Sequence, residues 1–388
     1  MKGSGLHCPD TARSCQNAHP LLSIAIVLAC TYGTFLAPAQ AQDAQLGLPV
    51  SSNKHTPREA ALVAAGKTLF FDRRLSADGS VSCATCHQPA RAFTDGRPLA
   101  QGIAARLGSR NTPTLLNAAY NLSQFWDGRR ATLEEQAVDP FFNPLEHGLK
   151  DQEALLGLVR RIPYYRKPLT AAFNIAPEEI GISHVSKSIA AYEATLVAGG
   201  SAFDRYYFGK DQAALSPAAQ RGLALFTGQA RCASCHLIGK DSALFSDNRF
   251  HSMQIGLDRI AGQLPSLTAR LVQARQQGAG LDQTILGHGD IAELGRFVVT
   301  LEPSDIGAFR TPGLRNVALT APYMHDGSVA TLAEAISLEA DYRHALAPGQ
   351  LPLGADEKAD LLAFLQSLTS PIAKRFSRPA KDGHAGSR

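Results

Sequence analysis

Cysteine, methionine and tryptophan are scarce in this chain of 388 residues, which has seven, three and one of them, respectively. Three of the cysteines, Cys8, Cys15 and Cys30, lie near the N-terminus. The other four all belong to two similar motifs at residues 83–87 and 232–236, so beyond residue 30 none is left over for a structural disulfide. The scarcity argues against a small disulfide-stapled scaffold and draws attention to these two motifs.

Features of several other function classes are also missing. The net charge is only +4, and no basic stripe carries interleaved aromatic residues, so nucleic acid is not an expected partner. We find no glycine-rich dinucleotide fingerprint at a strand–helix turn and no nucleophile elbow, so hydride transfer and hydrolysis have no support. Beyond residue 41 no apolar run is long enough to cross a bilayer, so the mature chain is predicted to have no transmembrane segment.

The first 41 residues have the pattern of an export signal. An apolar run at residues 21–31 follows two basic residues and is too short to span a bilayer. Residues 39–41 (AQA) form a small-residue cleavage site. These features predict a signal peptide over 1–41 and a periplasmic protein. A rival site at residues 28–30 resembles a lipobox and would leave a lipid-anchored Cys30.

The two cysteine motifs read C-A-T-C-H and C-A-S-C-H. C-x-x-C-H is the attachment signature of c-type haem, in which both thiols bond to the haem and the histidine ligates the iron. A zinc ribbon is the alternative, but its C-x-x-C pairs lie about 15–20 residues apart and need no adjacent histidine. The sequence therefore predicts two covalently bound haems c. Their attachment residues are Cys83, Cys86 and His87 for the first and Cys232, Cys235 and His236 for the second.

Helical signals dominate the rest of the chain. Thr56 and Glu59 form a capping-box pattern before a helix that runs to Phe71, and Ser216-Pro217 starts a similar helix that runs to Phe226. Each of these helices precedes a haem motif, and residues 66–70 (GKTLF) echo residues 222–226 (GLALF). Helical spacing of apolar residues recurs at 151–161, 187–198, 331–339 and 356–368, whereas few windows alternate with period two.

We therefore predict a mostly α fold with two c-type cytochrome domains, each of which wraps one haem with long loops. The predicted segments are the signal peptide (1–41), the N-terminal domain (42–200), the C-terminal domain (201–373) and a flexible basic tail (374–388).

The first haem has no evident sixth ligand in its own stretch of sequence. Neither histidine nor methionine occurs between His87 and His147. A haem that only carries electrons keeps two protein ligands, whereas a haem that activates peroxide needs an open or displaceable position. This absence favours peroxide chemistry at the first haem.

Seven further motifs give the chain its resemblance to a known family. They are residues 92–96 (AFTDG), 110–113 (RNTP), 126–129 (WDGR), 143–146 (NPLE), 245–248 (FSDN), 309–312 (FRTP) and 322–327 (PYMHDG). With the two haem motifs, they make the chain resemble the bacterial di-haem cytochrome c peroxidases and the related MauG-type enzymes over roughly residues 55–370. The resemblance implies a peroxide-reactive N-terminal haem, an electron-transfer C-terminal haem and, in many members, a homodimer.

The resemblance also implies roles for residues near the first haem. Glu146 matches the distal glutamate, which takes a proton from the bound oxygen of peroxide and returns it to the leaving oxygen. Gln136 and Pro140 match other residues of that pocket. Trp126 matches the tryptophan between the two haems and would relay electrons. Without the resemblance, Glu146 could be a surface carboxylate and Trp126 a core aromatic residue.

A calcium site and a propionate contact are expected as well. Asn111 and the backbone carbonyls of Thr320 and Pro322 match the family's inter-haem calcium site, and oxygen ligands of this kind suit calcium. Arg310 is expected to pair with a haem propionate, because a planar guanidinium group matches a carboxylate.

The sequence departs from the family at the position that caps the first haem. Family members of the peroxidase type carry a histidine on the loop after the first haem motif, and by spacing this position is Ile103 here. We therefore expect a first haem that is open as isolated and that needs no reductive activation. His147 is a weaker candidate for a substitute ligand.

The sixth ligand of the second haem is a further departure. Glu339 falls where the family has methionine or tyrosine, and Tyr342 lies about one helical turn further on. Met324 is the only methionine nearby in that stretch and ranks behind these two. In addition, Ala230 stands where MauG has the surface tryptophan through which it oxidises its protein partner.

These observations predict an exported di-haem peroxidase. It would reduce hydrogen peroxide to water with electrons from a small periplasmic cytochrome c or cupredoxin. The alternative keeps the peroxide chemistry but oxidises side chains of a partner protein, as MauG does. A non-enzymatic di-haem electron carrier is the third interpretation, and the distal residues Glu146 and Gln136 argue against it.

Overall fold

The computed structural model describes residues 45–50, 56–281, 288–346 and 352–371. The predicted signal peptide with its alternative anchor Cys30, and the basic tail, lie outside these residues. All of the described residues belong to one compact unit within residues 42–388.

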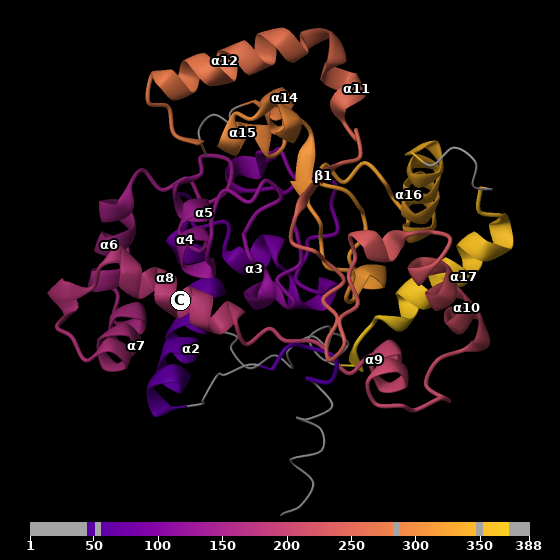
Figure 1. Cartoon of the computed structure of the whole chain (residues 1–388). Coiled ribbons are helices and arrows are strands. Elements are labelled where there is room, and N and C mark those ends of the chain that lie inside the picture. Colours follow the sequence, from indigo (N-terminus) through magenta and orange to yellow (C-terminus); the bar gives the residue numbers. More distant parts are fainter. Residues whose placement is uncertain (1–44, 51–55, 282–287, 347–351, 372–388) are drawn as a thin grey trace, which may run out of the picture. The chain divides into compact units, whose positions relative to one another are not determined.

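Short helices joined by long loops make up the described residues (Figure 1), which confirms the prediction of a mostly helical fold. In the first half they are α2 (Pro57–Phe70), α3 (Cys83–Cys86), α4 (Leu133–Gln136), α5 (Asp139–Phe142), α6 (Gln152–Arg161), α7 (Pro163–Phe173) and α8 (Ile182–Glu193). In the second half they are α9 (Ala202–Tyr207), α10 (Pro217–Thr227), α11 (Leu257–Ile260), α12 (Leu264–Gln276), α14 (Gly289–Ala292), α15 (Phe297–Thr300), α16 (Leu332–Leu346) and α17 (Ala355–Ser367).

Sequence signals locate several of these helices well. The predicted capping box is present at the start of α2, where Thr56 and Glu59 each accept a hydrogen bond from the backbone N–H of the other. The helix predicted over 187–198 instead begins at Ile182 and ends at Glu193. Beyond that end, the Asn117 side chain hydrogen-bonds to both the backbone N–H and the carbonyl of Ala198. These backbone groups are therefore not available for helical hydrogen bonds.

The repeated glycine has a structural reason in both halves. α2 packs against α8, and α10 packs against α17. At Gly66 of α2 a Cβ would overlap the carbonyl oxygen of Ser188, and at Gly222 of α10 it would overlap the carbonyl oxygen of Asp360. Each glycine therefore lets a helix preceding a haem motif cross a second helix at backbone contact, which accounts for the echo between residues 66–70 and 222–226.

We expect the substitutions Gly66→Ala and Gly222→Ala each to lower the free energy of unfolding by about 1–3 kcal/mol, because the added methyl meets backbone atoms and not a movable side chain. Gly157 on the exposed face of α6 is the matched control, since nothing lies within 4 Å of its would-be Cβ. Gly157→Ala should stabilise the protein by up to about 1 kcal/mol. Urea denaturation of the three variants measures both effects, and equal effects at all three positions would contradict the close crossings.

Buried apolar residues of the described chain form three clusters. The first includes Phe70, Phe141 and Leu155, and the second includes Phe203, Phe226 and Phe364. The third is built by α11, α12, α14 and α15 around residues such as Leu267 and Val298. The sequence patterns did not predict this third cluster. The domain boundary at residue 200 stays a prediction.

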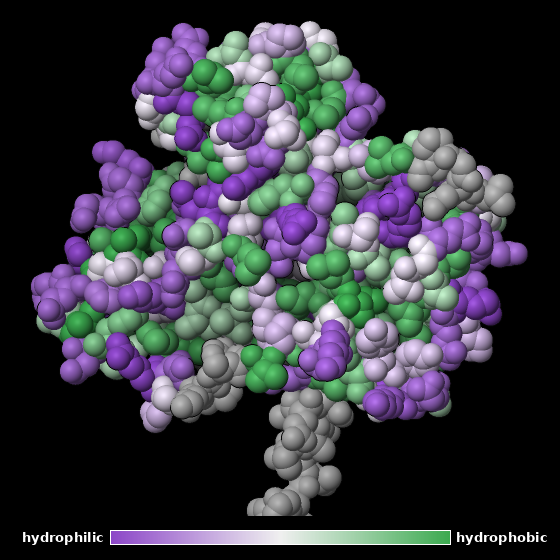
Figure 2. Space-filling view, in the orientation of Figure 1, coloured by the Kyte–Doolittle hydropathy of each residue, from purple (hydrophilic) through white to green (hydrophobic). Residues whose placement is uncertain are grey.

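A two-stranded antiparallel sheet supports the site in the second half. β1 (Phe250–Ser252) pairs with β2 (Ala308–Arg310), with Phe250 opposite Arg310. Figure 2 shows hydrophilic side chains at the outer edges of α6 and α7 and at one end of α12, next to hydrophobic ones, as expected for helices that bury one face only. Within the described ranges, the helices are too short or too polar to cross a bilayer.

Candidate haem sites

The two C-x-x-C-H motifs form tight turns that gather their own side chains. Cys83–Cys86 form the four-residue helix α3, and residues 232–234 form a single 3-10 turn. All four cysteines are unpaired and half-buried. Burial raises the pKa of the Cys86 and Cys232 thiols to about 12, so these groups are neutral thiols at pH 7 in the protein without haem.

Both motif histidines are held in the orientation that a metal ligand requires. The Nδ1–H of His87 donates to the carbonyl of Phe93 (3.0 Å), and that of His236 donates to the carbonyl of Phe245 (2.8 Å). This leaves Nε2 of each ring as the acceptor, and metal-binding histidines are commonly fixed by such a bond. Burial lowers the pKa of both imidazoles, which favours the neutral form that binds metals.

A cavity of about 440 Å³ lies beside the second motif and is lined by Cys232, Cys235 and His236. Residues from the first half, including Trp126 and Asn111, line the same cavity. The predicted inter-haem tryptophan therefore lines the same cavity as the second haem motif.

Arg310 gives an independent sign of a bound anion in this cavity. It is 8% exposed, and its Nη1 donates to Asn121 Oδ1 and to the carbonyl of Thr311, each at 3.3 Å. Its Nε is buried and has no hydrogen-bond partner. Burial lowers the pKa of Arg310 to about 10. A buried cation with a spare donor fits the carboxylate of a haem propionate.

The cavity and its lining therefore fit a covalently attached haem c at the second motif. Thiols, a correctly oriented imidazole nitrogen and a partner for a propionate converge there. At the first motif both cysteines are likewise free, and the ring of His87 is again bonded to a carbonyl.

All three candidates for the sixth ligand of the second haem line this cavity. The Tyr342 hydroxyl donates to the carbonyl of Ser252 (2.7 Å). Glu339 pairs with Arg343 (2.9 Å), and Arg343 Nη2 also lies 3.5 Å from the Cys235 sulfur. Met253, which follows β1, lines the cavity too. Met253 is therefore a second methionine at this wall, which the sequence did not indicate because the chain folds back and brings a residue distant in sequence to the cavity.

Around the first motif, the structure joins the predicted distal glutamate to the loop that bears Ile103. The backbone N–H of Ile103 donates to the carbonyl of Glu146 (2.9 Å), and Ile103 is 9% exposed. Asn143 Nδ2 donates to Glu146 Oε1. Ile103, the position at which the sequence predicts the missing capping histidine, thus lies beside Glu146 in space.

The other residues predicted for this pocket have distinct surroundings. Gln136 ends α4, and its side-chain oxygen is buried with no hydrogen-bond partner. Pro140 lies in α5, and its carbonyl accepts from the backbone N–H of His147 (3.1 Å). The Nδ1–H of His147 donates to the carbonyl of Leu75 (2.9 Å), and its ring packs edge-on against Phe141.

Trp126 is bonded to both halves of the chain. Its indole N–H donates to the carbonyl of Asn111 (2.9 Å), and its own carbonyl accepts from the backbone N–H of Arg310 (2.8 Å). The side-chain nitrogen of Asn111 donates to the carbonyls of Arg97 and Pro98, which leaves its oxygen for another partner. Asn111, Thr320 and Pro322, the three predicted calcium ligands, line one cavity.

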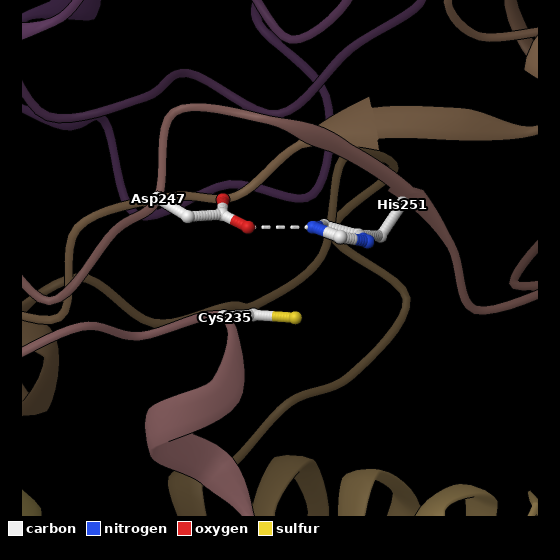
Figure 3. A group of neighbouring side chains, drawn as sticks. All are labelled: Cys235, Asp247 and His251. Carbon is white, nitrogen blue, oxygen red and sulfur yellow. Dashed lines mark hydrogen bonds and ion pairs between the residues drawn. The ribbon is translucent and has the colours of Figure 1, made fainter.

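Two clusters of potential ligand atoms were not predicted from the sequence. Cys235, Asp247 and His251 lie together, with Nε2 of His251 2.8 Å from Asp247 Oδ2 (Figure 3). Because haem attachment would consume the Cys235 thiol, this group belongs to the second haem site.

The other cluster consists of three buried residues, Glu293, His325 and Asp326. Glu293 accepts from Nε2 of His325 (2.8 Å), and Arg259 bonds to both Glu293 (2.9 Å) and Asp326 (2.7 Å). His325 also stacks on Phe309 with ring centroids 3.7 Å apart. The bound arginine already supplies a positive charge to these carboxylates. The sequence signal for the cluster was the His-Asp pair of residues 322–327, whereas Glu293 and Arg259 come from distant segments.

Known proteins resemble the chain over most of its length. The family model described as "Di-haem cytochrome c peroxidase" matches residues 60–212. The chain is 36% identical to cytochrome-c peroxidase IdrP1 of Denitromonas iodatirespirans, over 90% of the chain and 93% of that protein. It is also 36% identical to the methylamine utilization protein MauG of Methylophilus methylotrophus, over 83% of the chain and 86% of that protein. The crystal structure of a MauG-like protein associated with microbial copper homeostasis superposes with a TM-score of 0.65 at 32% identity, covering 84% of this chain and 95% of that one.

This chain belongs to the di-haem cytochrome c peroxidase family. It is an oxidoreductase of the peroxidase type, and membership implies haem c as its cofactor. The resemblance inferred from the motifs is thereby confirmed.

Proposed function

We propose that the protein reduces hydrogen peroxide to water at the first haem site, with electrons delivered one at a time by a small periplasmic cytochrome c or cupredoxin. The observation that carries this proposal is the pairing of Glu146 with the Ile103 loop. The backbone N–H of Ile103 donates to the carbonyl of Glu146, which supports a pocket with a carboxylate and an apolar side chain side by side. Export to the periplasm rests on the signal-peptide pattern of residues 1–41.

Glu146 is the acid–base group in this proposal. The amide of Asn143 donates to one oxygen of the Glu146 carboxylate, which orients the group. Glu146 accepts that proton and then donates it to the departing oxygen, so that water leaves instead of hydroxide. A haem bound at His87 would supply the iron that receives peroxide. Gln136 and Pro140 complete the wall of the pocket.

Transfer of electrons between the two sites is assigned to Trp126. Its indole N–H donates to a backbone carbonyl, which is a poor proton acceptor, so the indole keeps its proton when it loses an electron. A calcium ion held by Asn111, Thr320 and Pro322 would fix the loops on both sides of this relay. Arg310 would bind a propionate of the second haem.

Glu339 is the sixth ligand that the contacts favour. A tyrosinate ligand must lose its proton, yet the Tyr342 hydroxyl uses that proton to bond Ser252. The Glu339 carboxylate acts as a hydrogen-bond acceptor toward Arg343, which holds it at the wall of the cavity.

We expect Glu339→Gln to change the ferric spectrum of the second haem and to raise its midpoint potential, because an anionic ligand favours ferric iron. Tyr342→Phe is the matched control and should leave both unchanged. Absorption and electron paramagnetic resonance spectra with a potentiometric titration measure this. A spectrum altered in Tyr342→Phe but not in Glu339→Gln would assign the ligand to tyrosine.

The reductant is tested by steady-state turnover. The holoprotein is mixed with peroxide and a reduced small cytochrome c, and donor oxidation is followed. The proposal predicts catalytic oxidation of two donor molecules per peroxide. A long-lived oxidised enzyme with little donor oxidation would instead favour oxidation of a partner protein. That alternative is weakened by Ala230, which is buried where MauG has its surface tryptophan.

A further inference from the structure

Glu193 is a buried carboxyl group for which the peroxide mechanism has no use. It is the last residue of α8 and only 4% exposed. Its Oε2 is buried and has no hydrogen-bond partner. Burial alone raises the pKa of Glu193 to about 8, so that the side chain binds a proton at neutral pH.

The surroundings of Glu193 belong to the first haem site. Glu193 interacts electrostatically with Cys83, where it adds to the burial that raises the pKa of that thiol. α8 also packs against α4, the helix that ends at Gln136. Gln136 too has a buried oxygen with no partner. The haem attachment residue and a predicted peroxide-pocket residue therefore lie on elements next to Glu193.

No other ionisable group around α8 offsets the effect of burial on the pKa of Glu193. Tyr192 is its neighbour in sequence, and the presence of Glu193 contributes to the raised pKa of that phenol. The remaining ionisable groups on α8 and on the helices packed against it are His184 and Lys187 on α8, Arg58, Glu59 and Lys67 on α2, Glu134 and Glu135 on α4, and Tyr164, Tyr165, Arg166 and Lys167 on α7. None of these is a cause of the shift at Glu193, which is due to burial.

We propose that Glu193 is a redox-linked proton-binding group of the first haem site, which takes up a proton when the iron at His87 gains an electron and releases it when the iron loses that electron. The proposal rests on the proposed function, because it requires a haem attached at Cys83. The step is balanced: ferric iron plus one electron from the redox partner gives ferrous iron, while the carboxylate plus one proton from water gives the carboxylic acid.

The physical reason is the change of one charge in a poorly solvated region. Ferric iron carries one more positive charge than ferrous iron, and this charge stabilises a nearby carboxylate more strongly inside a protein than it would in water. Oxidation of the iron therefore favours loss of the proton. Because Glu193 Oε2 is buried with no hydrogen-bond partner, no hydrogen bond at that oxygen offsets the change in charge at the iron.

The test is the pH dependence of the midpoint potential of the first haem, measured by potentiometric titration of the holoprotein in the presence of mediators. The wild-type potential should fall with rising pH at a slope approaching one proton per electron around neutral pH. Glu193→Gln should remove the slope. Glu193→Asp, which keeps a carboxyl group, should retain it. Glu178→Gln is the matched control, because Glu178 is exposed on the surface, and it should behave like the wild type.

A second measurement tests the buried proton itself. In the unfolded chain Glu193 loses its proton near the ordinary pKa of 4.5, whereas in the folded protein burial raises this pKa to about 8. The thermal midpoint of the wild type should therefore fall as pH rises through this window, and Glu193→Gln should lose that decline.

The outcomes separate this proposal from the proposed function. A first-haem potential independent of pH, or a slope that persists in Glu193→Gln, would overturn the role of Glu193 while peroxidase activity remained. Absence of a haem at the first motif would overturn both. If Glu193→Gln does not fold, a wild-type potential that does not change with pH, or a wild-type thermal midpoint that does not fall between pH 4.5 and about 8, still overturns the role of Glu193.

Discussion

We expect Glu146→Gln to slow the reaction of the oxidised holoprotein with peroxide by about 10²–10⁴-fold, the usual contribution of a general acid–base group. Glutamine keeps the shape of the side chain, and its oxygen can still accept from Asn143. It can no longer accept the proton of peroxide and return it to the leaving oxygen. Stopped-flow absorption of the haem bands, recorded against peroxide concentration, gives the second-order rate constant.

The control for this variant is Glu134→Gln on α4. Glu134 is exposed, in contrast to the half-buried Glu146, and the substitution removes the same charge from the same part of the chain. It should react with peroxide at the wild-type rate. If Glu146→Gln also reacted at that rate, proton transfer would have to be assigned to another group, and Gln136 and His147 would be the next positions to replace.

The largest effect on stability is expected from Arg315→Met. Arg315 is 4% exposed and Asp204 is fully buried, and two hydrogen bonds of 2.8 and 2.9 Å join them. Arg315 also donates to the carbonyls of Gly47 and Ala243, so that it fastens the N-terminal segment to the second half. Removing one member of a buried ion pair leaves the other charge unpaired, which costs about 3–5 kcal/mol.

Arg205→Met is the comparison for Arg315→Met. Arg205 lies one residue after Asp204 and pairs with Asp211 at 4.0 Å, with both side chains about half exposed. Solvent-exposed ion pairs contribute about 0–1 kcal/mol, so this variant should unfold almost as the wild type does. Equal losses of unfolding free energy in the two variants, measured by urea denaturation, would show that burial does not decide the strength of these pairs.

Local sequence signals predicted the elements that local forces determine. Capping residues and apolar periodicity gave α2, α6, α10 and α17 within a residue or two. α7 was missed, because it carries Pro168 in its interior and its apolar pattern is irregular. The cluster around α12 was missed because its helices bury their apolar faces mainly against one another, and no signal in the sequence pairs them.

The same distinction holds for the site. C-x-x-C-H is a local motif, so the haem attachment residues could be identified without any structure. The bond between the Ile103 loop and Glu146, the position of Met253 and the orphaned carboxyl of Glu193 depend on contacts between distant segments. The sequence does not indicate whether a single charged side chain is buried. Glu193, for example, lies in a helix whose sequence predicts an ordinary amphipathic face.

The most direct test of the central claim is stopped-flow mixing of the fully oxidised holoprotein with peroxide, without prior reduction. Because Ile103 stands in place of a capping histidine, we predict an immediate change in the spectrum of the first haem, followed by rapid oxidation of reduced cytochrome c. A spectrum that stays unchanged until one haem has been reduced would contradict this account, since it would mean that a ligand closes the first haem in the resting protein.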